Sequence, residues 1–481
     1  MNILQLLNNV LPLHTQTNTN AAQVVMQQES NISFRSKVGL VMAAVGSAVG
    51  LGNIWKFPYI AGESGGGAFL LVYLGCVLFF GLPLLMTEFV IGKHTGKSVF
   101  GAFRALSGNN RWQWLGWSCL IVTIFVMAFY SVVTGWCINY LVDALGGSLM
   151  QSADMSAHFA QVSTDTKRML IYSIAAIMLT ACVLWFDINK GIERISKLLT
   201  PLLLLLMVLM SLRVLMLPDS NAGMRFLFEA DFSKITPKVI LSAMGQCFFS
   251  LSIGFGALIT YGSYMPKRQN IMATSLQVAV LDTLVAVLAG VIIFPAVFAF
   301  GLDPAEGPEL VFVVLPSVFE QMSLSWLSSV LFFGLLCIAA ITSMISLMEV
   351  VVAFLTEATA HYKHPLNRHR AVGITIGICI AMCSLCVFSV SDSSGMLSIG
   401  GRNVFQLLDI ISSYFLLPLN VLAISIFVGW FMPKSTIVQE MSSGRNKLYA
   451  KMSQLYVQIV RYLIPLAIAA IFVNELIEFA F

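Results

Sequence analysis

The sequence predicts an all-α integral membrane protein with eleven transmembrane helices, of which the first and the sixth are discontinuous. Two observations predict this class. Of the 481 residues, 58% are hydrophobic and 10% are charged, whereas soluble domains carry about 25% charged residues. The apolar residues also gather in stretches close to the roughly 20 residues that a helix needs to cross a bilayer. Most of the chain must therefore face lipid or other helices.

The apolar stretches follow one another along the chain with short polar loops between them. In order, they are 38–60, 67–92, 114–142, 169–187, 192–217, 238–262, 271–300, 324–359, 371–390, 404–431 and 455–478. Residues 1–33 begin rich in Asn and Gln without the basic-then-apolar order of a signal peptide, so we expect a disordered cytoplasmic lead. Most basic residues fall in alternate loops, which places the amino terminus in the cytoplasm and, after eleven spans, the carboxyl terminus outside.

Two of these stretches are interrupted near their middle by glycine-rich segments, GSAVGLGN at 46–53 and SLSIGFG at 250–256. A helix broken at membrane depth is tolerated only where it lines a protein cavity, because lipid cannot satisfy the freed backbone groups. Interrupted helices at matching positions of two halves mark the binding site of transporters built from inverted repeats. We therefore expect five-helix repeats of opposite topology over 34–217 and 238–431. Residues 432–481 would add a loop and an eleventh helix.

The same composition argues against several other functions. The net charge of +4 is too small to indicate a nucleic-acid partner. All nine cysteines lie inside apolar stretches, where a free Cys behaves as a small hydrophobic residue, so no disulfide framework is expected. The chain shows no convergent set of acid, base, nucleophile or metal ligands, so we expect neither an enzyme nor a bound cofactor.

Five motifs in order resemble the neurotransmitter:sodium symporter family, whose members have the LeuT-like fold. They are GSAVGLGNIWKFPYIAGESGGGAF (46–69), PLLMTEFVIG (83–92), NKGIERISK (189–197), FFSLSIGFGALITYGSY (248–264) and ITSMISLME (341–349). The likeness runs from about Phe34 to the end of the chain. It implies sodium-coupled uptake of a neutral amino acid by alternating access around a site midway through the bilayer. The membrane it implies is a plasma membrane, with the bacterial inner membrane as the expected location.

The resemblance implies two sodium sites, and hence two co-transported Na⁺ ions, beside the first broken helix. The first would use Ala48, Asn53, Ser250 and Asp282, together with the substrate carboxylate. The second would use the carbonyls of Gly46, Val49 and Ala339 and the hydroxyls of Thr342 and Ser343. Oxygen ligands suit a hard cation such as Na⁺. A carboxylate such as Asp282 inside a membrane span is costly and usually functional.

Asp282 departs from the pattern of many relatives. These carry Asn at this position and bind chloride through a Ser one turn later, where this chain has Ala286. A carboxylate at the sodium site would supply the missing negative charge permanently. We therefore expect transport that does not depend on chloride.

The resemblance also implies a substrate site at the first break. The backbone around Ala48, Leu51 and Gly52 would bind the substrate carboxylate, with a hydrogen bond from Tyr130. The substrate side chain would lie in a pocket formed by Val126, Phe249, Ser252, Phe255, Ser343 and Leu347. This pocket is apolar and uncharged, which favours neutral amino acids with hydrophobic or aromatic side chains.

Charged residues on both sides of this site are expected to act as gates. Outside, Lys56 and Asp409 would close over the substrate, with Gln246 nearby. Inside, the family pattern expects Arg and Trp ahead of the first helix, but this chain has Asn31 and Phe34. Glu357 stands where the acidic partner of that Arg would lie.

Nearby basic residues offer alternatives for the basic half of the inner gate. Arg35 or Lys37 could replace the missing Arg. Glu88 and Glu349 are two further carboxyl groups inside spans. Glu88 resembles the family's buried glutamate that holds the unwound backbone, so we expect backbone amides as its partners.

Two rival functions use the same residues. An amino-acid sensor of this fold would bind the substrate without moving it, and only a measurement of flux would distinguish it from a transporter. A proton-coupled carrier would be expected to have a basic group in place of Thr342 and Ser343, and this chain does not.

Overall fold

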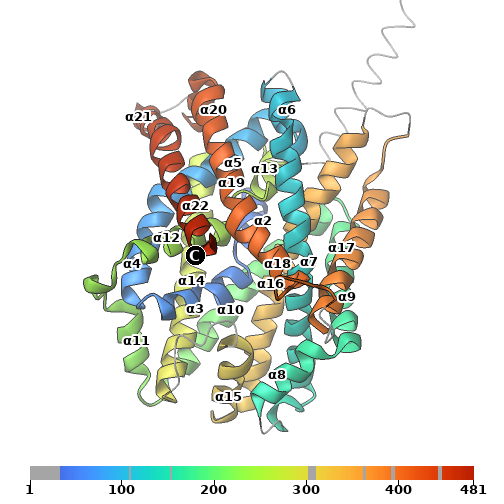
Figure 1. The fold of residues 1–481 in the computed structure, drawn as a ribbon. Helices are drawn as coiled ribbons and strands as arrows, with labels where there is room; N and C mark the ends of the chain where they lie inside the picture. Colours follow the sequence, from blue (N-terminus) through green and yellow to red (C-terminus); the bar gives the residue numbers. More distant parts are fainter. Residues whose placement is uncertain are drawn as a thin grey trace, which may run out of the picture.

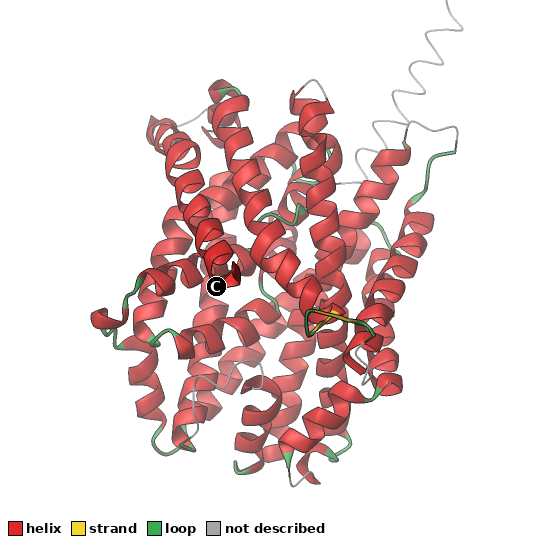
Figure 2. Ribbon diagram, viewed as in Figure 1, coloured by secondary structure: helices red, strands yellow, loops and turns green. Residues whose placement is uncertain are grey.

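The computed structural model describes residues 33–107, 110–151, 154–301, 310–360, 364–391, 396–442 and 447–480. Most of these residues are helical, and the strands they include are β1 (Ser398–Ile399) and β2 (Arg402–Asn403), a short antiparallel pair (Figure 2). Residues 1–32 of the expected amino-terminal lead, Asn31 among them, lie outside the described residues. The sequence did not predict the two-stranded hairpin.

In the first half of the chain, the described residues form fifteen helical segments, in which η marks short 3₁₀ or π-helical turns. They are α2 (Lys37–Ala48), η1 (Gly52–Lys56), α3 (Phe57–Glu63), α4 (Gly67–Cys76), η2 (Val77–Gly81), α5 (Leu82–Thr95), α6 (Val99–Ser107), η3 (Asn110–Trp112), α7 (Gln113–Leu145), η4 (Leu149–Gln151), α8 (Met155–Thr164), α9 (Thr166–Leu184), η5 (Asn189–Glu193), α10 (Arg194–Leu215) and α11 (Ser220–Phe228).

The second half continues the same architecture. Its segments are η6 (Phe232–Lys234), α12 (Pro237–Ser250), α13 (Ala257–Ser263), α14 (Ile271–Ala299), η7 (Leu310–Val314), α15 (Leu315–Glu320), α16 (Ser325–Thr359), α17 (Arg368–Ser391), α18 (Val404–Ile410), η8 (Ile411–Leu416), α19 (Leu417–Ile426), η9 (Phe427–Phe431), α20 (Lys434–Ser442), α21 (Lys447–Gln458), η10 (Ile459–Leu463) and α22 (Ile464–Ala480).

Polar caps explain where several of these helices begin. The hydroxyl of Ser36 accepts a hydrogen bond from the amide of Gly39 at the start of α2, and Asn270 does the same for Ala273 in α14. Thr236 caps α12, whose first residue is a proline. Such caps satisfy amides that have no partner within the helix, so they fix the starting residue.

Nine helices in the described ranges are long and apolar enough to cross a membrane. A tenth is added when α2 and the segment Gly52–Glu63, which are bent by 49° at the first break, count as one span. The expected span 238–262 is divided between α12 and α13, and each is too short to be counted alone. The other expected spans agree with the helices to within a few residues, while the count of eleven and the inverted repeats stay predictions.

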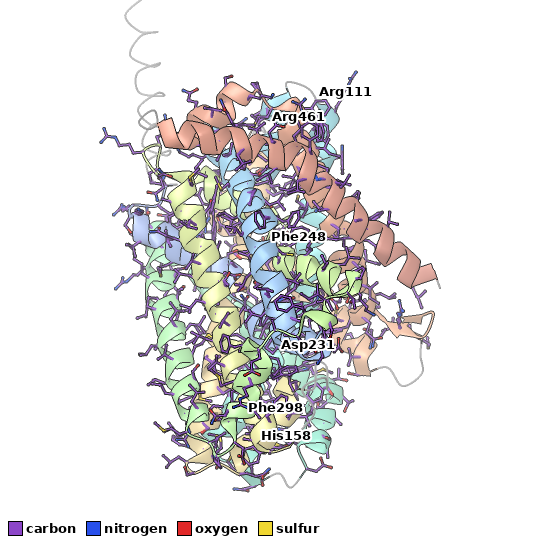
Figure 3. All side chains as sticks on the ribbon, turned by 90° about the vertical axis from the view of Figure 1, so that its left-hand side faces the viewer. Arg111, His158, Asp231, Phe248, Phe298 and Arg461 are labelled. Carbon is purple, nitrogen blue, oxygen red and sulfur yellow. The ribbon has the colours of Figure 1, made fainter. Side chains whose placement is uncertain are left out.

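The loops between spans divide between the two ends of the helix bundle. Figure 1 shows α6, α20 and α21 at the upper end and α8, α11 and α15 at the lower end. Arg111 and Arg461 lie near one end in Figure 3, His158 and Phe298 lie near the other, and Phe248 lies between them. Phe248 belongs to α12 just before the second break, so this break is midway along the bundle.

The core forms around α7 and α16, which pack against each other more extensively than any other pair of described helices. Helices at the periphery, such as α9 and α10, expose large apolar side chains, among them Ile171, Leu198 and Leu205. An exposed apolar surface of this kind is suited to lipid. All nine cysteines are unpaired thiols, and Cys182 near the end of α9 is the exposed one.

Candidate functional site

The first break lies between α2 and η1 and brings backbone groups close to two other helices. Val49 has an extended backbone, which ends α2. A Cβ atom at Gly50 would lie 2.8 Å from the hydroxyl of Tyr130 on α7 and still closer to the hydroxyl of Ser343 on α16. Only glycine fits between these hydroxyls without displacing one, so the break is held tightly against α7 and α16.

The second break separates α12 from α13 by residues 251–256. Ser252, Gly254 and Gly256 have φ angles of 54°, 88° and 81°, in the left-handed region. Alternate left-handed residues cannot continue a right-handed helix, and only glycine adopts this conformation without cost. The amide of Gly254 donates to Oε1 of Glu88 at 2.6 Å, as expected for Glu88. The carbonyl of Phe255 accepts from Thr123 on α7 at 2.9 Å.

The structure brings together the three side chains predicted for the first sodium site. Nδ2 of Asn53 donates to Oδ1 of Asp282 at 2.8 Å and to Oγ of Ser250 at 2.9 Å. The Ser250 hydroxyl donates to Oδ2 of Asp282 at 2.7 Å. These residues come from η1, α12 and α14, and all three are buried. The fourth predicted ligand, Ala48, is buried at the end of α2.

Asp282 is fully buried and surrounded by neutral groups. Among the described residues, the ion pairs include none that gives Asp282 a basic partner. Tyr73 of α4 adds a hydroxyl that donates to Ser250 at 3.2 Å, which sequence reasoning did not find because Tyr73 lies in an ordinary apolar stretch. A buried carboxylate without a basic neighbour is costly, and a cation among these oxygens would offset its charge.

The residues predicted for the second sodium site also meet. The hydroxyl of Ser343 lies 3.3 Å from the carbonyl oxygens of Gly46 and Val49. The hydroxyl of Thr342 donates to Ala339 within α16 at 3.0 Å. Carbonyl oxygens at the end of α2 therefore face the Ser343 hydroxyl, while the Thr342 hydroxyl bonds back to its own helix. Carbonyl and hydroxyl oxygens are ligands suited to a hard cation.

The predicted substrate residues surround the same breaks. The amide of Leu51 donates to the hydroxyl of Tyr130 at 3.2 Å. The rings of Phe249 and Phe255 meet edge to face at 6.2 Å, and a Cβ at Gly52 would lie 2.9 Å from the Phe249 ring. The hydroxyl of Ser252 donates to the carbonyl of Ser47 at 2.8 Å, which ties the two breaks together. The remaining predicted pocket residues, Val126, Ser343 and Leu347, are buried on α7 and α16.

Two cavities lie beside these residues. The smaller one, of about 80 Å³, is lined by Leu51, Gly52 and Tyr130 and also by Lys56 and Asp409. The larger one, of about 920 Å³, is lined by residues of η1, α3, α12 and η8 and is widely open. Lys56 and Phe249 belong to both linings, so they stand between the open cavity and the small one.

The predicted outer-gate residues lie at this boundary. The Lys56 ammonium lies 4.5 Å from the centre of the Phe249 ring, where the ring quadrupole attracts a cation. Asp409 accepts a hydrogen bond from Ser413 at 2.8 Å. Gln246 donates to the carbonyl of Gly52 at 2.8 Å, so it supports the backbone of η1.

On the other side of the site, hydrogen bonds tie the predicted inner-gate residues to neighbouring segments. Glu357 accepts hydrogen bonds from the amide of Ser98, at 2.8 Å, and from its hydroxyl. The backbone amide of Arg35 donates to Glu193 at 2.8 Å. These contacts join α16 to α6 and the start of α2 to η5.

Glu349 is held by partners that the sequence did not reveal. Arg368 binds both of its carboxylate oxygens, at 3.0 and 2.7 Å, and the hydroxyl of Tyr264 donates to it at 2.8 Å. The carbonyl of Tyr264 in turn accepts from the amide of Phe34, at 3.0 Å. A carboxyl group inside a span indicates that a basic partner exists. Arg368 lies beyond a loop from Glu349, so the sequence alone could not identify it as that partner.

Comparisons with known proteins identify the family of this chain. The profile of the "Sodium:neurotransmitter symporter family" matches residues 32–160 and 152–481. The sodium-dependent transporter YhdH of Bacillus subtilis (strain 168) is 36% identical over 451 residues, which cover 93% of this chain and 98% of YhdH. A sodium-dependent transporter of Haemophilus influenzae is 33% identical over 456 residues, which cover 92% of this chain and 98% of the relative.

A solved structure shares the fold as well. The crystal structure of MhsT in complex with L-phenylalanine has a TM-score of 0.84 and 36% sequence identity, and it covers 92% of this chain and 99% of MhsT. The relatives are membrane transporters and not enzymes. From its motifs, its apolar helices and these matches, the chain belongs to the sodium:neurotransmitter symporter family.

Proposed function

We propose that this protein couples the inward flow of Na⁺ to the uptake of a neutral, hydrophobic or aromatic L-amino acid, without a requirement for chloride. Transport would proceed by alternating access around the two breaks, with two Na⁺ ions carried per substrate. The family membership supports the dependence on sodium. The finer statements rest on the residues at the breaks.

One observation carries the proposal. Asn53, Ser250 and Asp282 come from three separate helices, two of them ending or beginning at a break, and their polar atoms lie within 2.9 Å of one another. The cluster is neutral apart from one buried carboxylate. A monovalent cation would balance this charge, and the adjacent amide of Leu51 could then hold a substrate carboxylate against the same cation.

The lining of the small cavity supports the substrate class. It is formed largely by apolar and aromatic side chains, among them Phe129, Val133 and Phe405, which favour a hydrophobic or aromatic substrate, while Lys56 and Asp409 are its charged lining residues. At about 80 Å³, the cavity is smaller than the 300 Å³ or more typical of ligand pockets. Substrate binding would therefore require the helices at the breaks to move apart, as alternating access demands. MhsT, the structural relative, was solved with L-phenylalanine.

We also propose eleven spans in two inverted five-helix repeats, with the amino terminus in the cytoplasm. Counting α12 and α13 together as one broken span gives the eleventh, because the bent pair at the first break already gives a tenth. The end of the bundle that carries α6, α20 and α21 would face the cytoplasm, since their loops are rich in Lys and Arg (Figure 1).

Uptake of tritiated L-phenylalanine into proteoliposomes tests the proposal. An inward Na⁺ gradient should drive accumulation, while an equal K⁺ gradient should not. Unlabelled L-leucine should compete, whereas L-glutamate and L-lysine should not. Binding of L-phenylalanine without flux would indicate a sensor, and uptake driven by a proton gradient in K⁺ would indicate a proton-coupled carrier. Either result would replace the proposal, and protein-free liposomes serve as the control.

A further inference from the structure

The second break is also bonded to α19, a helix that contributes no residue to the proposed sodium and substrate sites. Gly254 lies at its centre, with its amide bonded to Glu88 of α5. Its carbonyl accepts a hydrogen bond from Nδ2 of Asn420 on α19, at 3.0 Å. The two polar groups of one residue are thus fixed by side chains from two different helices.

Asn420 is itself bonded to a third helix. The hydroxyl of Ser118 on α7 donates to Oδ1 of Asn420 at 2.6 Å. The Gly254 carbonyl can only accept, so Nδ2 must face it, and Oδ1 is then free to accept the hydroxyl proton of Ser118. Asn420 is fully buried, so an alternative orientation would leave polar atoms without partners at a cost of about 1–3 kcal/mol.

Steric contact reinforces the hydrogen bond. A Cβ atom at Gly254 would lie 2.8 Å from Cγ2 of Val421 and 3.3 Å from the carbonyl of Leu417, both on α19. The glycine therefore rests directly on α19, next to Asn420. Because Gly254 is packed so closely, a displacement of α19 would be transmitted to the non-helical segment of the break.

We propose that Asn420 is a positioning residue of the sodium and substrate site, acting through the carbonyl of Gly254. This inference rests on the proposed function. The break that Asn420 holds begins after Ser250, a member of the sodium cluster, and it contains Ser252 and Phe255 of the substrate pocket. The span that carries Asn420 also carries Asp409 of the outer gate, eleven positions earlier in the chain. Movement of this span would therefore reach the gate and the sodium ligands together.

The alternative is that Asn420 only satisfies a buried carbonyl and so stabilises the fold. The two roles differ in what a variant changes. A structural residue would alter the melting temperature and leave the sodium affinity of the folded protein intact. A positioning residue would alter the sodium affinity and the local protection of the break in protein that remains folded.

Three variants test the inference in purified full-length protein. Asn420→Leu removes both hydrogen bonds, and Ser118→Ala removes only the bond that Oδ1 of Asn420 accepts. Ser425→Ala is the matched control, because Ser425 is also buried on α19 and its hydroxyl bonds only Leu422 of the same helix. The readouts are hydrogen–deuterium exchange in peptides that cover residues 251–256 and the Na⁺ concentration that half-saturates thermal stabilisation, with K⁺ as the reference ion.

Asn420→Leu should speed exchange in 251–256 and raise the half-saturating Na⁺ concentration, each about fivefold, as for loss of one hydrogen bond of about 1 kcal/mol. Ser118→Ala should change both in the same direction by a smaller factor, and Ser425→Ala should change neither. If Asn420→Leu does not fold, Ser118→Ala decides. Exchange and Na⁺ response equal to those of Ser425→Ala would overturn the inference. If Na⁺ does not stabilise the unmodified protein, the proposed function fails. The exchange data would still show whether Asn420 holds residues 251–256 in place.

Discussion

Replacing Asp282 by Asn is the most direct test of the first sodium site. The substitution keeps the shape of the side chain and removes its charge, so Asn53 and Ser250 keep a polar neighbour of the same size. In the structure, each oxygen of the Asp282 carboxylate accepts one hydrogen bond, from Asn53 at 2.8 Å and from Ser250 at 2.7 Å. The substitution therefore removes the charge and also turns one of the two acceptor oxygens into an NH2 donor, so one of these hydrogen bonds must reverse or break.

The magnitude follows from the loss of one charged ligand. Interactions of polar groups with a charged partner contribute about 1.5–3 kcal/mol. At 1.36 kcal/mol per tenfold change, this predicts a rise of about 10- to 150-fold in the half-saturating Na⁺ concentration. Two unit charges 4 Å apart interact with about 4 kcal/mol at an effective dielectric constant of 20, so this range is a conservative one.

The assay is Na⁺-dependent uptake of tritiated L-phenylalanine into proteoliposomes, measured over a wide range of Na⁺ concentrations. Thr283→Ala is the control, because Thr283 is the next residue of α14 and its hydroxyl has no hydrogen-bond partner among the residues that the structure describes. Replacing chloride by gluconate should leave uptake by the unmodified protein unchanged. A half-saturating Na⁺ concentration for Asp282→Asn equal to that of the control, or a steep chloride requirement in the unmodified protein, would refute this reasoning.

Three further predictions concern the pocket and the gates. Leu347→Val removes one methylene, worth about 0.8 kcal/mol, so competition assays should shift about fourfold from L-leucine toward L-phenylalanine; an unchanged ranking would place the pocket elsewhere. Lys56→Gln should favour the outward-open form, so a cysteine placed in the large cavity should label faster while Na⁺ binding survives; unchanged labelling and uptake would make Lys56 a mere anchor. Tyr264→Phe removes the hydroxyl bonded to Glu349 and so loosens the inner side of the site, and a cysteine engineered there should label several-fold faster from the cytoplasmic side. Tyr456→Phe removes a tyrosine hydroxyl that bonds Thr87 instead, and the same rise in that variant would show a nonspecific effect.

The breaks and the meeting of Asn53, Ser250 and Asp282 could be predicted from the sequence because these residues violate the local pattern, whereas the assignment of sodium to them stays a prediction. Glycines and polar side chains at 46–53 and 250–256 stand out in apolar stretches, and Asp282 is a charge where none is expected. The contacts that depend on long-range packing could not be predicted. Asn420 lies in a span that also contains several serines, and nothing local distinguishes it as the partner of Gly254.

On the inner side of the site, too, the partners of charged residues depend on long-range packing that the sequence does not reveal. Glu357 was expected at a gate from its position relative to the family pattern, and the structure brings Ser98 to it. That gate assignment stays a prediction. Glu349 and Arg368 are nineteen residues apart and separated by a loop, so only the packing of α16 against α17 brings them together.

The distribution of thiols makes this chain convenient for spectroscopic reporters. Eight of its nine cysteines are buried, and Cys182 is the exposed one. A single Cys182→Ser substitution would leave a background in which a maleimide dye or spin label reacts chiefly with one engineered position. With two engineered cysteines in this background, the distance between their labels across the two breaks could be followed during turnover, with the packing of the native core left intact.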